Sequence, residues 1–199
     1  MDKILEDEIK KIKNHPGDTI GSGILDDFEF ILKKEREEGL KKLDDAMAEV
    51  GCFRQKDVKN FKWYPVGCYL TNLILAKDIF GWDDNVFKEM GANAQKISLI
   101  TRTMMKYFVS FKKCFEITQD YWGAFFTVGR LEGMEVNEKE RHAFIVLKDF
   151  PGHPYYCRYL EGGFTQVVSY IAKNSGCREI KCSLKGEGED HLFQVTWEI

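Results

Sequence analysis

Residues 123–150 read GAFFTVGRLEGMEVNEKERHAFIVLKDF, and here the pattern of apolar residues changes from a helical period to an extended one. Residues 123–136 and residues 141–150 are rich in β-branched and aromatic side chains, and a polar segment, residues 137–140, separates them. Such runs around a short polar turn are typical of paired strands. This stretch therefore predicts two strands joined by a turn.

The segments on either side extend the pattern. Residues 155–173 place their apolar side chains on one face of a helix, and residues 177–185 and 191–199 are predicted strands, the last with alternating apolar positions. The residues before the first strand are mainly helical in period. Helices separated from a largely antiparallel sheet make an α+β domain, so we expect N-terminal helices followed by a β-β-α-β-β unit.

The helical half carries an apolar seam at spacings of three and four. It predicts an amphipathic helix with a break near Gly91. Such a seam can pack in an ordinary core, line a ligand cavity or form a subunit interface. Its members are Phe87, Met90, Ala94, Ile97, Thr101, Met104, Phe108, Phe111 and Phe115. A second helical region, residues 24–50, is expected to divide at Gly39.

Two breaker segments near the N-terminus suggest a boundary. A short polar helix is expected over residues 2–13, and the stretches 15–18 and 21–23 then interrupt it with Pro and Gly. We therefore expect residues 1–23 to form an N-terminal extension and linker, and residues 24–199 to form one ligand-binding domain.

Composition limits the function classes. The 199-residue chain has a formal net charge of -3, and no basic stripe with interleaved aromatic residues is evident. This gives no argument for nucleic acid or an anionic membrane as partner. No segment has the length of a membrane span, and the charged N-terminus is no signal peptide, so a cytoplasmic location is expected. The six cysteines are then expected to be reduced thiols or metal ligands, not disulfides.

The C-terminal part carries a recognisable series of motifs. A Cys followed by a Gly-aromatic pair occurs in 157–164 (CRYLEGGF), a Glu-x-x-Cys element in 179–182, and a Gly-acidic turn at 186–187, before a closing strand. In this order and spacing the chain resembles the 4-vinyl-reductase-like domains. Tyr64-Pro65 and the following helices also fit that superfamily, which contains haem-nitric-oxide-binding domains and Golgi-tethering TRAPP subunits.

The resemblance implies a domain that encloses a small hydrophobic molecule beside its sheet and that often forms homodimers through helices. Without a recognisable output segment in this sequence, a signal would pass to a separate partner protein. The candidate ligand-binding residues are aromatic groups on or near the seam: Phe108, Phe111, Phe115, Trp122, Phe125 and Tyr156. Each of them is also an ordinary core residue by its type.

The resemblance also implies a metal site. Some sensors of this family bind structural zinc through three Cys and one Glu, and the matching positions here are Cys157, Glu179 and Cys182. The third Cys would fall near residue 190, where His191 stands instead. Zinc accepts sulfur, imidazole nitrogen and carboxylate oxygen, so these four residues could form a tetrahedral site. Cys177 is a poorer substitute, since it and Cys182 face opposite sides of a regular strand. The alternative is a group of buried, unreactive thiols.

Haem and catalysis find less support. The haem-binding relatives use a helical His and a Tyr-x-Ser-x-Arg element; this chain lacks that element, and its four His lie beside prolines or at strand starts, so haem bound in that way is not expected. No nucleophile elbow or phosphate-binding loop is evident. The leading hypothesis is therefore a non-catalytic sensor of a small hydrophobic molecule. The alternatives are an assembly module like the tethering subunits, and an enzyme acting on an apolar tetrapyrrole-like substrate.

Overall fold

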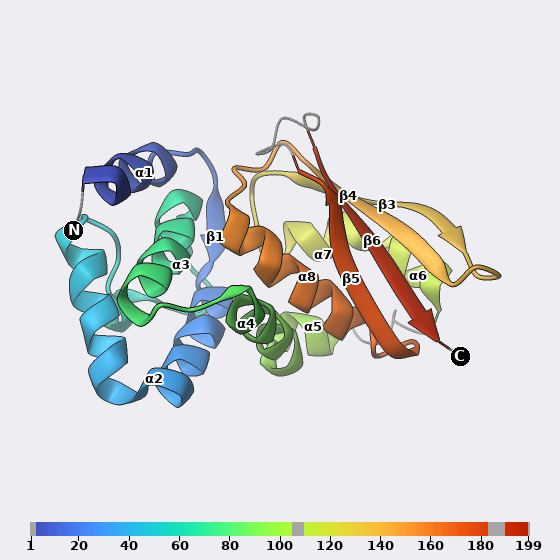
Figure 1. Ribbon diagram of the computed structural model, residues 1–199, viewed down its shortest axis with the longest axis horizontal. Coiled ribbons are helices and arrows are strands. Elements are labelled where there is room, and N and C mark those ends of the chain that lie inside the picture. The colour runs from blue at the N-terminus through green and yellow to red at the C-terminus, as the bar shows by residue number, and fades with distance from the viewer. Residues whose placement is uncertain (1–2, 105–109, 183–189, 199) are drawn as a thin grey trace.

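The computed structural model describes residues 3–104, 110–182 and 190–198. Its N-terminal half is built from helices α1 (Lys3–Lys13), α2 (Gly21–Glu49) and α3 (Val66–Phe80), with a two-stranded antiparallel sheet of β1 (Asp18–Ile20) and β2 (Trp63–Pro65). A short 3-10 turn, η1 (Gln55–Asp57), lies between α2 and β2. Figure 1 shows these helices gathered on one side of the molecule, away from the main sheet.

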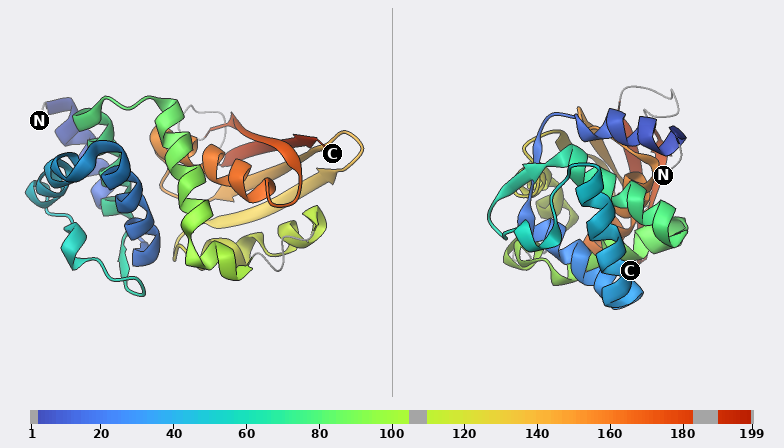
Figure 2. Two further views of the ribbon diagram at one scale, coloured as in Figure 1. Left: turned by 90° about the horizontal axis from the view of Figure 1, so that it is seen from below. Right: turned by 90° about the vertical axis from the view of Figure 1, so that its left-hand side faces the viewer.

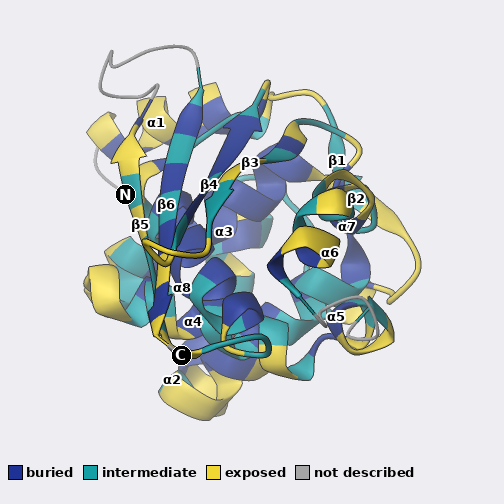
Figure 3. Cartoon of the chain, turned by 90° about the vertical axis from the view of Figure 1, so that its right-hand side faces the viewer, coloured by how far each residue is buried: buried dark blue, intermediate teal, exposed yellow. Residues whose placement is uncertain are grey.

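The C-terminal half contains a four-stranded antiparallel sheet in the order β3-β4-β6-β5. Its strands are β3 (Arg130–Asn137), β4 (His142–Lys148), β5 (Lys173–Lys181) and β6 (His191–Glu198), and α8 (Pro154–Val168) crosses from β4 to β5. The predicted α+β class and the β-β-α-β-β order are confirmed. Figure 3 shows the buried residues concentrated on the central strands, whereas the edge strand β5 is largely exposed.

Four helices connect the two halves: α4 (Asp84–Ile97), α5 (Leu99–Met104), α6 (Phe111–Glu116) and α7 (Thr118–Gly123). The expected break of the seam helix at Gly91 is wrong. Gly91 lies inside α4, and the first break is Ser98, whose extended backbone (ψ 125°) ends α4 while its hydroxyl accepts the N–H of Thr101. A serine that caps a helix stops the regular hydrogen bonding without any glycine.

Several predicted boundaries shift for local reasons. The first strand begins at Arg130 and not at residue 123, because residues 118–123 form α7. Helix α8 ends at Val168, and β5 begins at Lys173, earlier than expected. Helix α2 is interrupted at Arg36, which has φ 63°, and not at Gly39. Gly51, with φ 73°, follows the end of α2 in the left-handed conformation that glycine adopts most readily.

The N-terminal segment packs against the helical half. Helix α1 buries Leu5, Ile9 and Ile12, and it contacts α3. Residues 21–23, the expected linker, form the first turn of α2. A domain boundary at residue 23 stays a prediction. No helix in the described ranges is long and apolar enough to cross a membrane.

The expectation that all cysteines are reduced thiols or metal ligands is wrong for two of them. Cys52 follows α2, Cys68 lies in the first turn of α3, and the two form a disulfide with Cα atoms 5.5 Å apart. The expectation rested on the cellular compartment, which says nothing about the distance between two side chains. Cys114, Cys157, Cys177 and Cys182 form no disulfide.

Helix α8 is the central element of the fold. It packs on α4 on one side and on β5 and β6 on the other (Figures 1 and 2). The contact with α4 is made by glycines: a Cβ at Gly91 would lie 1.9 Å from the carbonyl oxygen of Tyr159, and one at Gly162 would lie 1.9 Å from that of Lys88. Small residues let the two backbones approach closely, so the faces of α8 are held in fixed positions.

Candidate metal cluster and apolar cavity

Helix α8 presents different chemistry on its two sides. His153 caps the helix through its ring Nδ1, which accepts the N–H of Tyr155, and Pro154 occupies the first turn. Cys157 faces the ends of β5 and β6, and Tyr156, Tyr159 and Leu160 face the helical half. The one helix therefore contributes to a polar cluster on the sheet side and to a cavity on the other side.

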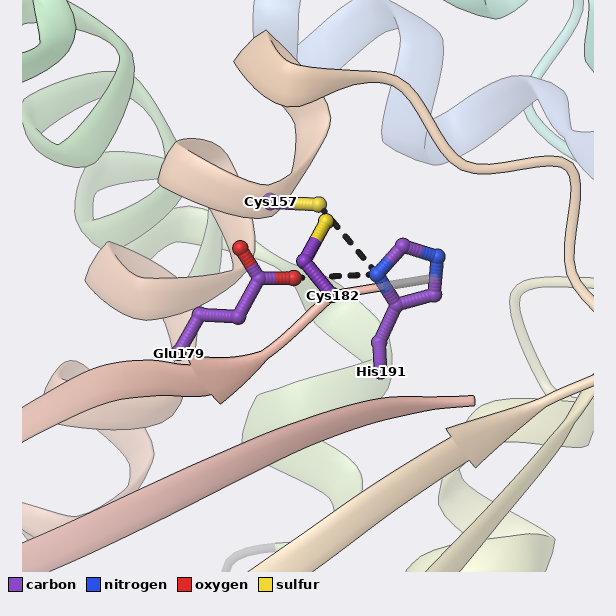
Figure 4. Close-up of side chains that lie close together, drawn as sticks. All are labelled: Cys157, Glu179, Cys182 and His191. Carbon is purple, nitrogen blue, oxygen red and sulfur yellow. Dashed lines mark hydrogen bonds and ion pairs between the residues drawn. The ribbon is translucent and has the colours of Figure 1, made fainter. Parts of the chain in front are cut away.

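The polar cluster contains the four residues expected as metal ligands. Cys157, Glu179, Cys182 and His191 place one donor atom each within 4.8 Å of the others. The Cys157 Sγ lies 3.5 Å from His191 Nδ1, and the same nitrogen lies 2.9 Å from Glu179 Oε1. Figure 4 shows the two sulfurs side by side and the imidazole facing both them and the carboxylate.

This donor set fits a zinc ion. A tetrahedral zinc ion with bonds of about 2.0–2.3 Å holds its ligand atoms roughly 3.3–3.8 Å apart. The distances between the donor atoms of the cluster, from 2.9 Å up to 4.8 Å, include this range. All four side chains are buried, with relative exposures of 2–3%. Thiolate, imidazole and carboxylate are the groups that zinc binds in structural sites.

Charged neighbours hold the carboxylate of the cluster. Arg158 donates to Glu179 Oε2 at 2.7 Å and to Glu161 Oε1 at 2.8 Å. Lys88, from α4, pairs with the other oxygen of Glu161 at 2.8 Å, and the Glu179 backbone N–H donates to Glu161 Oε1. This ion-pair chain joins the cluster to α4, so it fixes the orientation of Glu179 from behind.

The Glu179 carboxyl group and the Cys157 thiol of the cluster have pKa values shifted in opposite directions. Burial opposes ionisation of Glu179, yet hydrogen bonds from His191, Cys157 and Cys182 hold its pKa below the ordinary value. Burial, with the Glu179 carboxylate beside it, raises the pKa of the Cys157 thiol. A metal that binds here would therefore displace thiol protons, because only thiolates act as zinc ligands.

A cavity lies on the opposite side of α8. It measures about 40 Å³, counted as the space open to the centre of a water-sized sphere. This is smaller than the apolar cavity of about 150 Å³ that holds benzene in an engineered protein. Half of the residues that line it are aromatic: Tyr69, Tyr121, Trp122, Phe125, Phe126, Tyr156, Tyr159 and Phe164.

The cavity wall contains few polar groups, and one of them is pre-oriented. The Gln95 side-chain oxygen accepts hydrogen bonds from the hydroxyls of Thr101, at 2.8 Å, and of Tyr121. With the oxygen so engaged, the amide nitrogen is the remaining hydrogen-bonding group of the Gln95 side chain. Asp26 is the one charged residue among the described cavity-lining residues, and burial with the neighbouring Glu29 raises its pKa to about 7.

A second carboxyl group lies behind the wall. Asp27 is fully buried, and its Oδ1 accepts the Tyr159 hydroxyl at 3.0 Å, while its Oδ2 has no partner in the described part of the chain. Burial raises the pKa of Asp27 well above its ordinary value, and hydrogen bonds from Tyr159 and Tyr69 offset this only in part. Folding therefore favours the protonated, neutral form of this carboxyl group.

The six expected ligand residues fall in different places. Trp122, Phe125 and Tyr156 line the cavity. Phe115 instead lines a smaller void of about 30 Å³ on the other side of Tyr121, Phe164 and Val167. Phe111 stacks on Trp197, with ring centroids 3.8 Å apart. Phe108 lies outside the described residues. The structure thus gathers half of the expected set around the main cavity.

Sequence reasoning missed Tyr69, Tyr121, Tyr159 and Gln95. Tyr121 lies within the short helix α7, and Gln95 stands one residue after Ala94 of the seam. The helical spacing of apolar residues marks neither position. A weak signal existed on α8, where Tyr156 and Tyr159 stand three residues apart on one helical face.

The histidines do not fit haem in the cavity. His15 follows α1, His142 begins β4, His153 caps α8, and His191 belongs to the metal cluster. None of the four lines either void in the described residues. The cavity volume of about 40 Å³ also falls short of the pockets of about 300 Å³ or more that hold larger ligands. The residues present therefore supply no histidine ligand for haem there.

Comparison with solved structures identifies the fold. An H-NOX protein from S. oneidensis in the Fe(II)NO ligation state superposes with a TM-score of 0.64 and 10% identity, over 89% of this chain and 99% of that one. An unliganded Fe(II) H-NOX protein from K. algicida gives 0.61 and 12%, over 89% and 97%. A trafficking protein particle complex subunit 3 from Naegleria fowleri, covalently bound to palmitic acid, gives 0.51 and 15%, over 63% and 89%.

These likenesses show the fold alone, since the identities are low. The chain shares its fold with H-NOX domains and, over a shorter part, with a TRAPP subunit. No protein-family model matches the sequence, and no curated protein does. Other H-NOX neighbours are described through their haem, whereas the described cavity wall of this chain holds no histidine.

Proposed function

We propose that this chain is a sensor domain that binds one small, largely apolar molecule in the cavity between α4, α7 and α8. The observation that carries the proposal is the enclosed aromatic void of about 40 Å³ with a single fixed amide donor, Gln95. Sites of this kind bury an apolar body and use a few polar groups to orient it. The fold agrees with this role, since one neighbour of that fold is an H-NOX protein in the Fe(II)NO ligation state.

Size and polarity define the ligand class. The void excludes a macrocycle, and a single-ring molecule would enter it by moving the aromatic side chains of its wall outward. The Gln95 amide favours a ligand with one hydrogen-bond acceptor. A phenol-sized molecule meets both conditions. The assignment to the 4-vinyl-reductase-like group is part of this proposal, and it rests on the 157–164 and 179–182 motifs. A cytoplasmic location, a homodimer and a separate signalling partner are also parts of this proposal.

The test is thermal unfolding with a panel of single-ring compounds. A ligand at about 100 times its Kd stabilises the fold by about 2.7 kcal/mol through mass action, and phenol should act at lower concentration than toluene. Ala94→Leu fills the void, because Ala94 lines it, and should abolish the stabilisation. Ala92→Leu, on the same helix but outside the wall, is the matched control. No saturable stabilisation by any compound, with both variants like the parent, contradicts the proposal.

We also propose that Cys157, Glu179, Cys182 and His191 hold a structural zinc ion. The convergence of four buried donor atoms within 4.8 Å supports this. Native mass spectrometry without added metal reports zinc, subunit number and any bound small molecule in one measurement. One zinc per chain is the expected result; metal-free protein that also fails to take up zinc at equimolar concentration contradicts the metal site while leaving the cavity proposal standing.

An assembly module is the second candidate, because the TRAPP neighbour shares the fold. It predicts a filled cavity in solution and an interface that buries more than about 1,000 Å². The same mass spectrum separates the two functions. A ligand-free oligomer with a second protein, and no response to the compound panel, would favour assembly.

A further inference from the structure

The turn before β2 exposes two large aromatic side chains. Phe61 is 81% exposed and Trp63 is 44% exposed, although apolar rings of this size are usually buried. They stand two residues apart in sequence, on the segment that connects α2 to α3 and runs along the edge of the molecule (Figure 2). Exposed apolar side chains that gather on one segment are candidates for an interaction surface.

The turn is held rigidly. The backbone carbonyls of Asn60 and Lys62 accept the N–H groups of Ser22 and Gly21, at the start of α2. The Tyr64 hydroxyl accepts the Lys59 N–H at 2.8 Å and donates to the Asp57 carbonyl at 2.9 Å. Because these bonds fix the backbone, the two rings are presented outward without a further ordering cost.

Lysines surround the rings. Lys56, Lys59 and Lys62 are exposed, and none of them forms an ion pair with a described residue. Asp57 is the one acidic residue between positions 54 and 63, and Arg54 is already paired with Asp44 and Asp45. The segment is therefore locally positive, although the chain as a whole carries a net charge of -3.

We propose that this turn docks the protein on the surface of an anionic lipid bilayer, with Phe61 and Trp63 in the interface and the three lysines over the lipid headgroups. Tryptophan and other aromatic rings favour the boundary between water and acyl chains, and lysine stems extend along it while the ammonium stays hydrated. Each lysine near an anionic surface raises the partition about five-fold.

A protein partner fits the surface less well. Protein interfaces are depleted in lysine and enriched in arginine, whereas the free cations here are all lysines. A second copy of this chain related by a two-fold axis would place lysines against lysines, which repel. The combination of protruding rings and unpaired lysines thus favours lipid, and no helix of the described residues needs to cross the bilayer.

The experiment uses the intrinsic fluorescence of the full chain. Trp82, Trp122 and Trp197 are 3–6% exposed, so a change of emission on adding vesicles reports Trp63. Vesicles of phosphatidylcholine with phosphatidylserine should shift the emission to the blue and sediment the protein, and vesicles of phosphatidylcholine alone should do so much more weakly.

Matched variants separate the parts of the proposal. Phe61→Ser should weaken binding about ten-fold or more, whereas Met134→Ser, at a 51% exposed position of β3, should leave it unchanged. Lys59→Glu with Lys62→Glu should abolish the phosphatidylserine preference, and Lys139→Glu with Lys173→Glu, at exposed positions of the sheet end, should retain most of it. No emission shift, or equal binding by the Phe61 and Met134 variants, overturns the proposal. So does an oligomer that Phe61→Ser dissociates in the absence of lipid binding.

Discussion

Helix α8 separates two buried carboxyl groups whose surroundings differ. On the sheet side, Glu179 lies among Arg158, His191 and two thiols, and its pKa is held below the ordinary value despite burial. On the helical side, burial raises the pKa of Asp27 far above the ordinary value, and its neighbours are tyrosine hydroxyls and the carboxylate of Asp26. The side chains of both groups are almost fully buried. The difference shows that the neighbouring donors decide the charge, and depth alone does not.

The contrast assigns different roles to the two sides. An ionised carboxylate beside two thiols is suited to bind a metal cation. A neutral carboxyl group behind the aromatic wall accepts hydrogen bonds from tyrosine hydroxyls without placing a charge beside the cavity. The rigid α4–α8 contact keeps the two environments apart, and changes to that contact should disturb both.

Gly162→Ala should have the largest effect on stability, because it disturbs the α4–α8 contact that keeps the two environments apart. A Cβ at this position would meet the Lys88 carbonyl oxygen at 1.9 Å, so α8 must move away from α4. We expect a loss of unfolding free energy of about 3 kcal/mol or more, the upper range for overpacked sites, measured by urea denaturation.

Gly163→Ala is the matched control. Its Cβ would lie 3.5 Å from the nearest atom, an ordinary contact, and alanine has the higher helix propensity. Equal destabilisation by the two alanines would show that the tight crossing does not exist in solution.

Cys157→Ser should have the next largest effect and act on the sheet side only. Loss of one ligand should weaken zinc binding more than about 100-fold, beyond the 10–100-fold typical of changes to groups behind the ligands. Competition with a zinc-binding dye measures this. Cys114→Ser, at a buried thiol near Tyr121 and away from the cluster, should leave zinc affinity unchanged. If both variants retain zinc affinity, the metal lies elsewhere or the site is not formed.

The sequence carried unequal information about the two sides. The sheet-side residues occur in short motifs, Cys157 in one and Glu179 with Cys182 in another, and the antiparallel pairing of β5 with β6 brings His191 to them. The expectation of that grouping rested on the resemblance to the 4-vinyl-reductase-like domains. Whether it binds metal stays a prediction.

The contacts on the helical side could not be predicted from the sequence, for a physical reason. Asp27 and Tyr159 are 132 residues apart, and their bond depends on how α2 packs against α8, which no local period records. The seam predicted an apolar face but not which rings face empty space, so Phe111 and Phe115 were grouped with cavity residues that they do not join. The serine break at residue 98 turned the later part of the seam away.

Tyr159→Phe should change the helical side alone. It removes the hydroxyl that donates to Asp27 Oδ1 and leaves that buried oxygen with one partner fewer, so we expect a loss of about 1–3 kcal/mol. Tyr156→Phe is the control on the same helix, since no hydrogen bond of the Tyr156 hydroxyl is formed with the described residues. Thermal and urea unfolding compare the pair. A smaller loss for Tyr159→Phe than for Tyr156→Phe would contradict the assigned role of Asp27.

The smallest expected effect is the most direct test of the charge assignment. The folded protein holds a proton on Asp27 at pH values where the unfolded chain, with a pKa near 3.9, has released it. Since the folded state binds more protons, its stability falls as pH rises above about 4, by at most about 1.4 kcal/mol per pH unit for one group.

Asp27→Asn removes this dependence because the amide does not titrate. The difference in unfolding free energy between the variant and the parent should therefore move in favour of the variant as pH rises from 5 to 8. Asp26→Asn serves as the comparison, since its pKa of about 7 limits its contribution to the range between about pH 4 and 7. Parallel profiles for the parent and Asp27→Asn would mean that Asp27 is ionised in the folded state, and that its side of α8 resembles the Glu179 side after all.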